Sequence, residues 1–178
     1  MAIRVPAAGL RIASAATLAA ALLCAVSPAR AGDACDGSIQ ATSLRPLPSP
    51  VVLAIQATRT SPQEEKVRTR FADALQAAGV SVQPHADATM RVSFLVTAMD
   101  GGRPRQYTDF SWATGPGAAP LPPIITMTIT VSDPAKGTLL WVASLQCRIK
   151  TRDPEALATQ IGQVIGQTLG SHINDKSF

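Results

Sequence analysis

Residues 124–150 read IITMTITVSDPAKGTLLWVASLQCRIK, and this stretch decides the fold class. Two runs alternate apolar and polar side chains, and residues 133–137 between them are turn formers. Alternation with period two is typical of a β-strand with one buried and one solvent-exposed face. The stretch therefore predicts an antiparallel hairpin whose second strand, residues 138–150, turns five side chains inward: Trp141, Ala143, Leu145, Cys147 and Ile149.

Upstream of the hairpin, the sequence predicts a capped amphipathic helix. The side chain of Ser61 can cap the first turn, Pro62 fits the first helical position, and Glu64 completes a capping box. Apolar residues then recur at spacings of three and four. The helix is expected to end at Gly79, because glycine readily adopts the left-handed conformation found at helix C-termini. A second helix is predicted over residues 153–173 by the same kind of pattern.

Three further strands are predicted around the first helix, over residues 51–58, 80–83 and 89–99. Together with the hairpin and the last helix they give the order β-α-β-β-β-β-α. Each helix has one apolar stripe and the sheet has one apolar face, so both helices should cover that face. The expected fold class is therefore α+β: a two-layer α/β sandwich with a mixed sheet of about five strands and two helices on one face.

The chain should form a single folded domain. It has 178 residues, of which 46% are hydrophobic, a share that excludes intrinsic disorder. Prolines and glycines gather ahead of the first predicted strand and again in the middle of the chain. We expect a cleaved signal peptide over 1–31, an irregular N-terminal segment over 32–50, and one α/β domain over 51–175 that contains a long loop over 100–123.

The first residues have the parts of a secretory signal peptide: Arg4 and Arg11, an apolar run over 12–26, and a site of small residues that ends at Ala31. Cleavage after Ala31 would make the protein periplasmic or secreted, with no transmembrane segment in the mature chain. An uncleaved anchor is the alternative, although a run of about 15 residues is shorter than the ~20 that span a bilayer. Lipidation at Cys24 also stays open.

The charge balance excludes nucleic acid as an expected partner. The whole chain carries 16 basic and 12 acidic residues, but three of the arginines lie in the predicted signal peptide, so the cleaved chain is almost neutral. No cluster of lysine or arginine follows the cleavage site, and binding to a phosphate backbone needs such a cluster.

Cleavage would leave two cysteines, Cys35 and Cys147, in an oxidising compartment, where two thiols usually pair. We therefore predict a disulfide between Cys35 and Cys147, which would fasten the N-terminal segment to a late strand. A redox-active thiol is the alternative. Neither cysteine belongs to a Cys-x-x-Cys motif or has a histidine beside it, which speaks against that chemistry.

The last predicted helix carries Gly162, Gly166 and Gly170 at steps of four, which make a smooth groove along one side. Glycine destabilises a helix interior by roughly 1 kcal/mol relative to alanine, so three glycines need a packing reason. Two reasons are open. The groove either packs closely on the protein's own sheet or first helix, or it is a docking face for a partner helix.

The loop over 100–123 is the candidate binding site, because long loops without regular structure are usually functional or disordered. Aromatic and arginine side chains gather in it, and these residue types dominate the energetics of interfaces. The predicted partner-binding residues are Arg103, Arg105, Tyr107, Phe110 and Trp112. Alternatively, the three rings fold back and cover an edge of the core.

No motif in the chain predicts catalysis. The sequence has no nucleophile elbow, no phosphate-binding loop and no His-Glu-x-x-His motif. Two isolated histidines, His85 and His172, cannot complete a zinc site without carboxylates from elsewhere. We therefore expect no enzyme, no catalytic residues, no metal and no cofactor.

Several segments together carry a resemblance to a known group of proteins. They are FADALQAAGVSV (71–82), ATMRVSFLVTAM (88–99), GPGAA (115–119), VSDPAKGTLLWVAS (131–144) and the terminal helix. In these the chain resembles small exported bacterial envelope domains of unknown function, loosely similar to the TolB amino-terminal domain and to auxiliary or assembly lipoproteins. The resemblance implies a non-enzymatic domain that supports an envelope complex by binding another protein.

The expected function is therefore that of a periplasmic accessory or adaptor protein. It would bind an envelope protein through residues 103–112, with the exposed threonine face of the hairpin as a further contact. The alternative is a periplasmic carrier of a small ligand or lipid, with the 100–123 loop as a lid over an apolar cavity beneath Trp141. The sequence indicates no oligomeric state.

Overall fold

The computed structural model describes most of the chain beyond the predicted signal peptide, namely residues 34–55, 61–83, 90–100, 103–114 and 121–178. The predicted signal peptide over 1–31, His85 and the GPGAA segment lie outside the described residues.

Eight strands and three helices make up the described fold. In chain order they are β1 (Cys35–Ser43), β2 (Val52–Ile55), α1 (Pro62–Ala77), β3 (Ser81–Val82), β4 (Met90–Asp100), β5 (Arg103–Tyr107), α2 (Ser111–Thr114), β6 (Ile124–Asp133), β7 (Thr138–Ile149), α3 (Pro154–Thr168) and β8 (Ile173–Ser177). The strands form one sheet in the order β3-β2-β4-β6-β7-β1-β8, and β5 pairs with β4 beside this path. Strand β2 is parallel to β3 and β4, whereas all other pairs are antiparallel.

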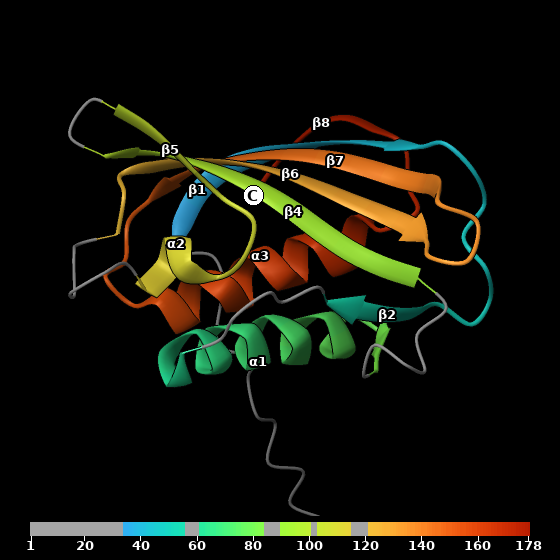
Figure 1. The fold of residues 1–178 in the computed structure, drawn as a ribbon. Helices are drawn as coiled ribbons and strands as arrows, with labels where there is room; N and C mark the ends of the chain where they lie inside the picture. The colour runs from blue at the N-terminus through green and yellow to red at the C-terminus, as the bar shows by residue number, and fades with distance from the viewer. Residues whose placement is uncertain (1–33, 56–60, 84–89, 101–102, 115–120) are drawn as a thin grey trace, which may run out of the picture.

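The two long helices, α1 and α3, lie on one face of this sheet, which we call the inner face (Figure 1). The opposite face is the outer face. The hairpin of β6 and β7 has the predicted alternation, because Thr126 and Thr128 are exposed while the inward residues of β7 are buried, among them Trp141, Ala143, Leu145 and Cys147. The structure confirms the α+β class and the two-layer arrangement.

The segment over 32–50 is not irregular, because it contains β1. This strand lies between β7 and β8 and pairs with β7 over its whole length, from Cys35 opposite Ile149 to Ser43 opposite Trp141. Its own residues are poor strand formers, with Asp36, Gly37 and Ser38 in a row. The strand is therefore stabilised by its pairing with β7, a long and largely buried neighbour, and not by its own strand propensity.

The loop over 100–123 also contains regular structure. Strand β5 folds back on the second half of β4 in an antiparallel pair, and α2 follows it as one short turn of helix. Strand β5 was not predicted because its sequence, RPRQY, is charged and contains a proline. The sheet therefore has eight strands instead of about five.

The last helix is shorter than predicted. Helix α3 ends at Thr168, because Leu169 has extended backbone angles and Gly170 has a φ of +77° in the left-handed region. The five residues of β8 then run along β1. This strand is almost wholly polar, so no alternation of apolar residues marks it in the sequence.

The start of α1 has the predicted capping box. The hydroxyl of Ser61 accepts a hydrogen bond from the backbone N–H of Glu64 at 3.2 Å, and the Glu64 carboxylate accepts one from the backbone N–H of Ser61 at 2.9 Å. Helix α3 begins with Asp153, whose carboxylate accepts from the backbone N–H of Glu155 at 2.9 Å. These bonds satisfy N–H groups that a helix start leaves without partners.

Two of the glycines in α3 face α1 at very short range. A methyl group added at Gly162 would lie 2.7 Å from the carbonyl oxygen of Phe71 and 2.8 Å from the Cβ of Ala74, and one added at Gly166 would lie 2.5 Å from the Cβ of Ala78. Contacts within the chain thus account for both glycines. Gly170 does not belong to this groove, because it follows the end of α3.

A valine at position 162 should disturb this contact. We expect Gly162→Val to lower the free energy of unfolding by roughly 1–3 kcal/mol, because the added carbons have no space against the backbone of α1. Gln167→Ala, on the exposed side of the same helix, should change it by no more than about 0.5 kcal/mol. Urea unfolding midpoints compare the two variants, and equal midpoints would contradict the close contact.

Candidate interaction surface

Three large apolar side chains lie exposed on the outer face, along β4 and towards the corner where β4 ends and β6 begins. Leu95 and Met99 on β4 are 41% and 43% exposed, and Ile124 at the start of β6 is 37% exposed. The neighbouring residues Ala98 and Ile125 pair with each other across the two strands, so Met99 and Ile124 are also cross-strand neighbours. We call Leu95, Met99 and Ile124 the outer apolar patch.

Polar groups and a hollow border this patch. Arg148 on β7 is exposed and pairs directly with Ile124, and the exposed Thr126 follows Ile124 on the same face. A hollow of about 260 Å³ lies beside Ile124 and Arg148, and Gln146, Ser38, Gly37 and Asp36 complete its lining. The corner therefore combines exposed apolar area, a guanidinium group and a depression that a side chain of another molecule could enter.

The five predicted partner-binding residues do not form one surface. Phe110 and Trp112 are only 3% and 4% exposed and belong to the core, and Phe110 packs edge-on against Phe71 of α1 with ring centroids 5.6 Å apart. Tyr107 is half-buried against the same core. Only Arg103 and Arg105 are exposed.

The prediction of a partner-binding aromatic loop is thus wrong for the two buried rings. The alternative, in which the rings cover an edge of the core, describes Phe110 and Trp112. The indole N–H of Trp112 has no hydrogen-bond partner among the described residues. Aromatic residues are enriched both in cores and at interfaces, so their presence in a loop did not distinguish the two.

Strand β5 lies at an edge of the sheet, but its sequence protects that edge. It pairs only with β4 among the described strands, and it carries Pro104 in the middle together with Arg103 and Arg105. Proline removes a backbone donor and arginine side chains keep an edge hydrated, so both oppose the addition of another strand. Contact with a partner is therefore better supported on the outer face than along this edge.

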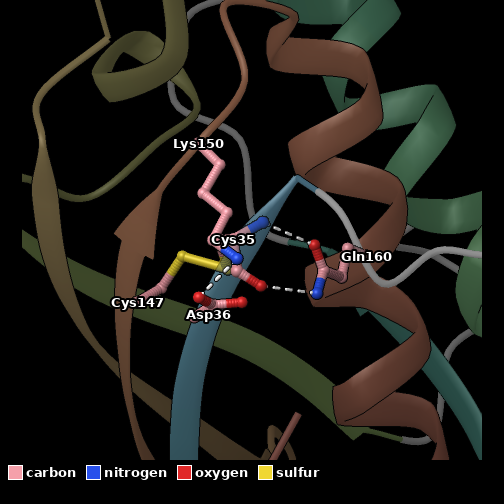
Figure 2. The surroundings of a disulfide bond; sticks show 5 residues. All are labelled: Cys35, Asp36, Cys147, Lys150 and Gln160. Atoms are coloured by element: carbon pink, nitrogen blue, oxygen red, sulfur yellow. Dashed lines mark hydrogen bonds and ion pairs between the residues drawn. A yellow bond between two sulfur atoms is a disulfide. The ribbon is translucent and has the colours of Figure 1, made fainter.

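The predicted disulfide joins β1 to β7 (Figure 2). Cys35 and Cys147 are fully buried, and their Cα atoms lie 5.8 Å apart, within the usual range for disulfides. The side-chain amide of Gln160 on α3 both donates to the carbonyl of Cys35 and accepts from its N–H, each at 2.8 Å. Gln160 thus binds the edge of β1 as a neighbouring strand would.

An ion pair lies beside the disulfide at the protein surface. The ammonium group of Lys150 is 2.5 Å from a carboxylate oxygen of Asp36, and both side chains are about half exposed. Exposed pairs of this kind contribute little to stability. The buried bridge and Gln160 add to the backbone pairing with β7 in holding the start of β1.

The described residues give no chemical reason to assign catalysis to this corner. No group of three or more metal-ligating side chains occurs among them. The pKa of Glu65 is lowered because Arg68 donates hydrogen bonds to its carboxylate, but this pair lies on α1 and not on the outer face. None of the helices in the described ranges is long and apolar enough to cross a membrane.

The sequence contained a signal for the patch that the sequence-based prediction missed: apolar residues at strand positions that face outward. Leu95 and Met99 occupy the same alternate positions of β4 as the polar residues Ser93 and Thr97, and these positions belong to the outer face of the sheet. Ile124 stands next to Ile125, so one of the two must face outward at the start of β6. Apolar residues in the exposed phase of neighbouring strands are the feature to look for.

Comparisons with known proteins show no family for this chain. No family model matches it, and no curated protein matches it. The expected resemblance to the TolB amino-terminal domain and to auxiliary lipoproteins gains no support from them.

Solved structures with a similar arrangement do exist. The PelC dodecamer from Paraburkholderia phytofirmans is 18% identical, with 76% of this chain and 99% of that chain covered and a TM-score of 0.46. A PDZ domain protein from Parabacteroides distasonis is 9% identical, with 82% of this chain and 39% of that chain covered and a TM-score of 0.45. At these scores the likeness carries no argument about function.

Phe110 and Arg103 should respond differently to truncation. We expect Phe110→Ala to lower the free energy of unfolding by about 3–5 kcal/mol, because it empties a buried ring site next to Phe71. Arg103→Ala should stay within about 0.5 kcal/mol, since the side chain is exposed. Chemical unfolding followed by circular dichroism measures both, and a neutral Phe110→Ala would contradict the burial of the ring.

The disulfide leads to a separate expectation. A chain cleaved after Ala31 should show no free thiol in a titration, whether native or unfolded, and two reacting thiols would contradict the bridge. Replacing Cys35 and Cys147 together by serine should lower the free energy of unfolding by about 2–4 kcal/mol, because the bridge closes a long loop. Thermal unfolding with and without reductant provides the comparison.

Proposed function

We propose that this chain is a non-enzymatic accessory protein of the periplasm that binds a partner protein of an envelope complex through the outer apolar patch. The observation that carries the proposal is the exposure of Leu95, Met99 and Ile124 on the same face of two neighbouring strands, with Ile124 beside a hollow. Single exposed apolar residues are ordinary, whereas a group of them with a polar border is typical of docking sites.

Physical chemistry favours a protein as the occupant of this corner. The burial of three large side chains removes apolar surface from water, which is the main favourable contribution to most protein association. Arg148 can donate several hydrogen bonds from its planar guanidinium group, and arginine is enriched where interfaces are strongest.

The compartment is argued from the cysteines and the N-terminus. A buried disulfide persists in an oxidising environment, and disulfides are rare in the reducing cytosol. The bridge therefore supports an extracytoplasmic protein, and the predicted signal peptide over 1–31 specifies the periplasm or the exterior. The partner is accordingly expected in the cell envelope.

A carrier of a small ligand or lipid is the second candidate. The segment over 100–123 was expected to form its lid, and part of that segment lies outside the described residues; the hollows beside Ile124 and Leu140, both formed by described residues, are lined by other parts of the chain. Trp141, under which the cavity was expected, is fully buried and donates from its indole N–H to the carbonyl of Ser171 at 3.0 Å. We therefore place the adaptor first.

In-cell photocrosslinking tests the adaptor. A photoreactive amino acid at position 99 should capture one protein of defined mass, because Met99 lies in the patch. The same amino acid at position 76 is the control, since Gln76 is exposed on α1. Equal capture at both positions, or none at position 99, would contradict the assignment of the patch.

A pair of aspartate variants sharpens this test. Leu95→Asp with Ile124→Asp should abolish the adduct at position 99, because a buried carboxylate without a partner opposes the interface. Leu44→Asp is the matched control, because Leu44 is another exposed leucine and lies outside the patch. An adduct that survives the double variant would exclude the patch as the contact.

A further inference from the structure

A second hollow lies at the other end of the hairpin from the outer apolar patch. It has a volume of about 490 Å³ and forms between the turn that joins β6 to β7 and the chain that follows β1. This volume is within the range of small-molecule binding sites. Its position makes it independent of the proposed function, because Ile124 begins β6 and the turn follows the end of β6.

The lining on one side is apolar and firmly held. It consists of Pro46, Leu47, Pro48 and Leu140. Leu140 is buried, and its carbonyl oxygen accepts hydrogen bonds from the backbone N–H groups of Leu44 at 2.9 Å and of Arg45 at 3.1 Å. These bonds fix the chain after β1 to β7, so the hollow is a preformed feature of the fold.

Gly170 has a part in placing this apolar side. A methyl group at Gly170 would lie 3.0 Å from a Cδ atom of Leu47, which is a tight contact. Leu47 in turn packs against the main core. Gly170, which follows the end of α3, therefore leaves space for Leu47, which lines the hollow.

The rim of the hollow is cationic. Arg45 is exposed and has no ion-pair partner among the described residues, and the side chain of Lys136 is 77% exposed. Asp133 is the acidic residue of the lining, and its Oδ1 accepts from the backbone N–H groups of Ala135 and Lys136 at 2.9 and 3.2 Å. Its Oδ2 lies 3.5 Å from Nζ of Lys136. The carboxylate is thus engaged in the turn and offsets one cation, which leaves an excess positive charge at the rim.

We infer that this hollow binds an anionic amphiphile, a molecule with one phosphate or carboxylate head and an alkyl chain. The alkyl chain would cover Leu47 and Leu140, and the head would accept hydrogen bonds from Arg45 and Lys136. Arginine presents several donors in a planar fork that suits both kinds of head group. A head without charge would lose the complementarity with the rim, and an anion without a chain would lose the apolar contact.

Calorimetric titration with dodecyl phosphate below its critical micelle concentration tests the inference. We expect saturable binding to one site of the purified protein. Inorganic phosphate and dodecyl maltoside should each bind at least tenfold more weakly, since the first lacks the chain and the second lacks the charge. Equal binding of dodecyl maltoside and dodecyl phosphate would overturn the inference, as would the absence of saturable binding.

Matched charge variants locate the site. Arg45→Glu with Lys136→Glu should weaken the binding of dodecyl phosphate at least tenfold, whereas Arg103→Glu with Arg105→Glu, the same change of charge on β5, should leave it within twofold. All four side chains are exposed, and unfolding midpoints equal to that of the parent establish that each variant folds. An equal loss in both double variants would overturn the site, because it would reflect net charge alone.

A second measurement does not depend on any variant. Amide resonances of Arg45, Leu47 and residues 136–140 should shift on titration with dodecyl phosphate, whereas those of Leu95 and Met99 should not. Free amphiphile and membrane lipid share the same chemistry, so vesicles of neutral and anionic phospholipid provide the other arm. Binding to both forms places lipid among the ligands, and binding to the monomer alone assigns a free amphiphile. Binding to vesicles without binding of the monomer would overturn the inference.

Discussion

The close approach of α1 and α3 is the constraint on which the two-layer structure depends. Two helices must share one face of the sheet, and each must keep its apolar stripe on that face. Gly162 and Gly166 remove the side chains that would separate them, so the backbone of α3 lies directly against Phe71, Ala74 and Ala78. Packed helices are usually 8–10 Å apart, and small residues permit the shorter end of that range. The helix propensity lost at these glycines is offset by the core contacts that the approach allows.

Much of this fold was predictable because its signals are local. The alternation along 124–150 depends only on neighbouring residues, and so does the capping box at Ser61. Strands β1, β5 and β8 were not predictable in this way, because their polar sequences form strands only when a longer strand is already beside them. The end of α3 at Thr168 depended on the left-handed backbone of Gly170, a residue whose spacing also fitted a helical groove.

The candidate surface was harder to predict than the fold, and for a physical reason. A ring such as Phe110 lowers the free energy by leaving water, whether it enters the protein's own core or a partner's surface. Composition cannot separate these outcomes, whereas the phase of Leu95 and Met99 within β4 does, because it fixes the face to which they point. The disulfide was easier to predict, since the predicted cleavage removes Cys24 and leaves two cysteines, which allow one pair.

The first strand, β1, pairs with the last two strands, β7 and β8. Cys35 and Cys147 are 112 positions apart, and β1 lies between β7 and β8. A chain is synthesised from its N-terminus, so β1 must remain unpaired until nearly all other elements have been made, while β6 and β7 can already pair through their short turn. Such long-range pairing slows folding and leaves the edge of β7 open in the meantime. The domain thus completes its folding at the segment that was synthesised first.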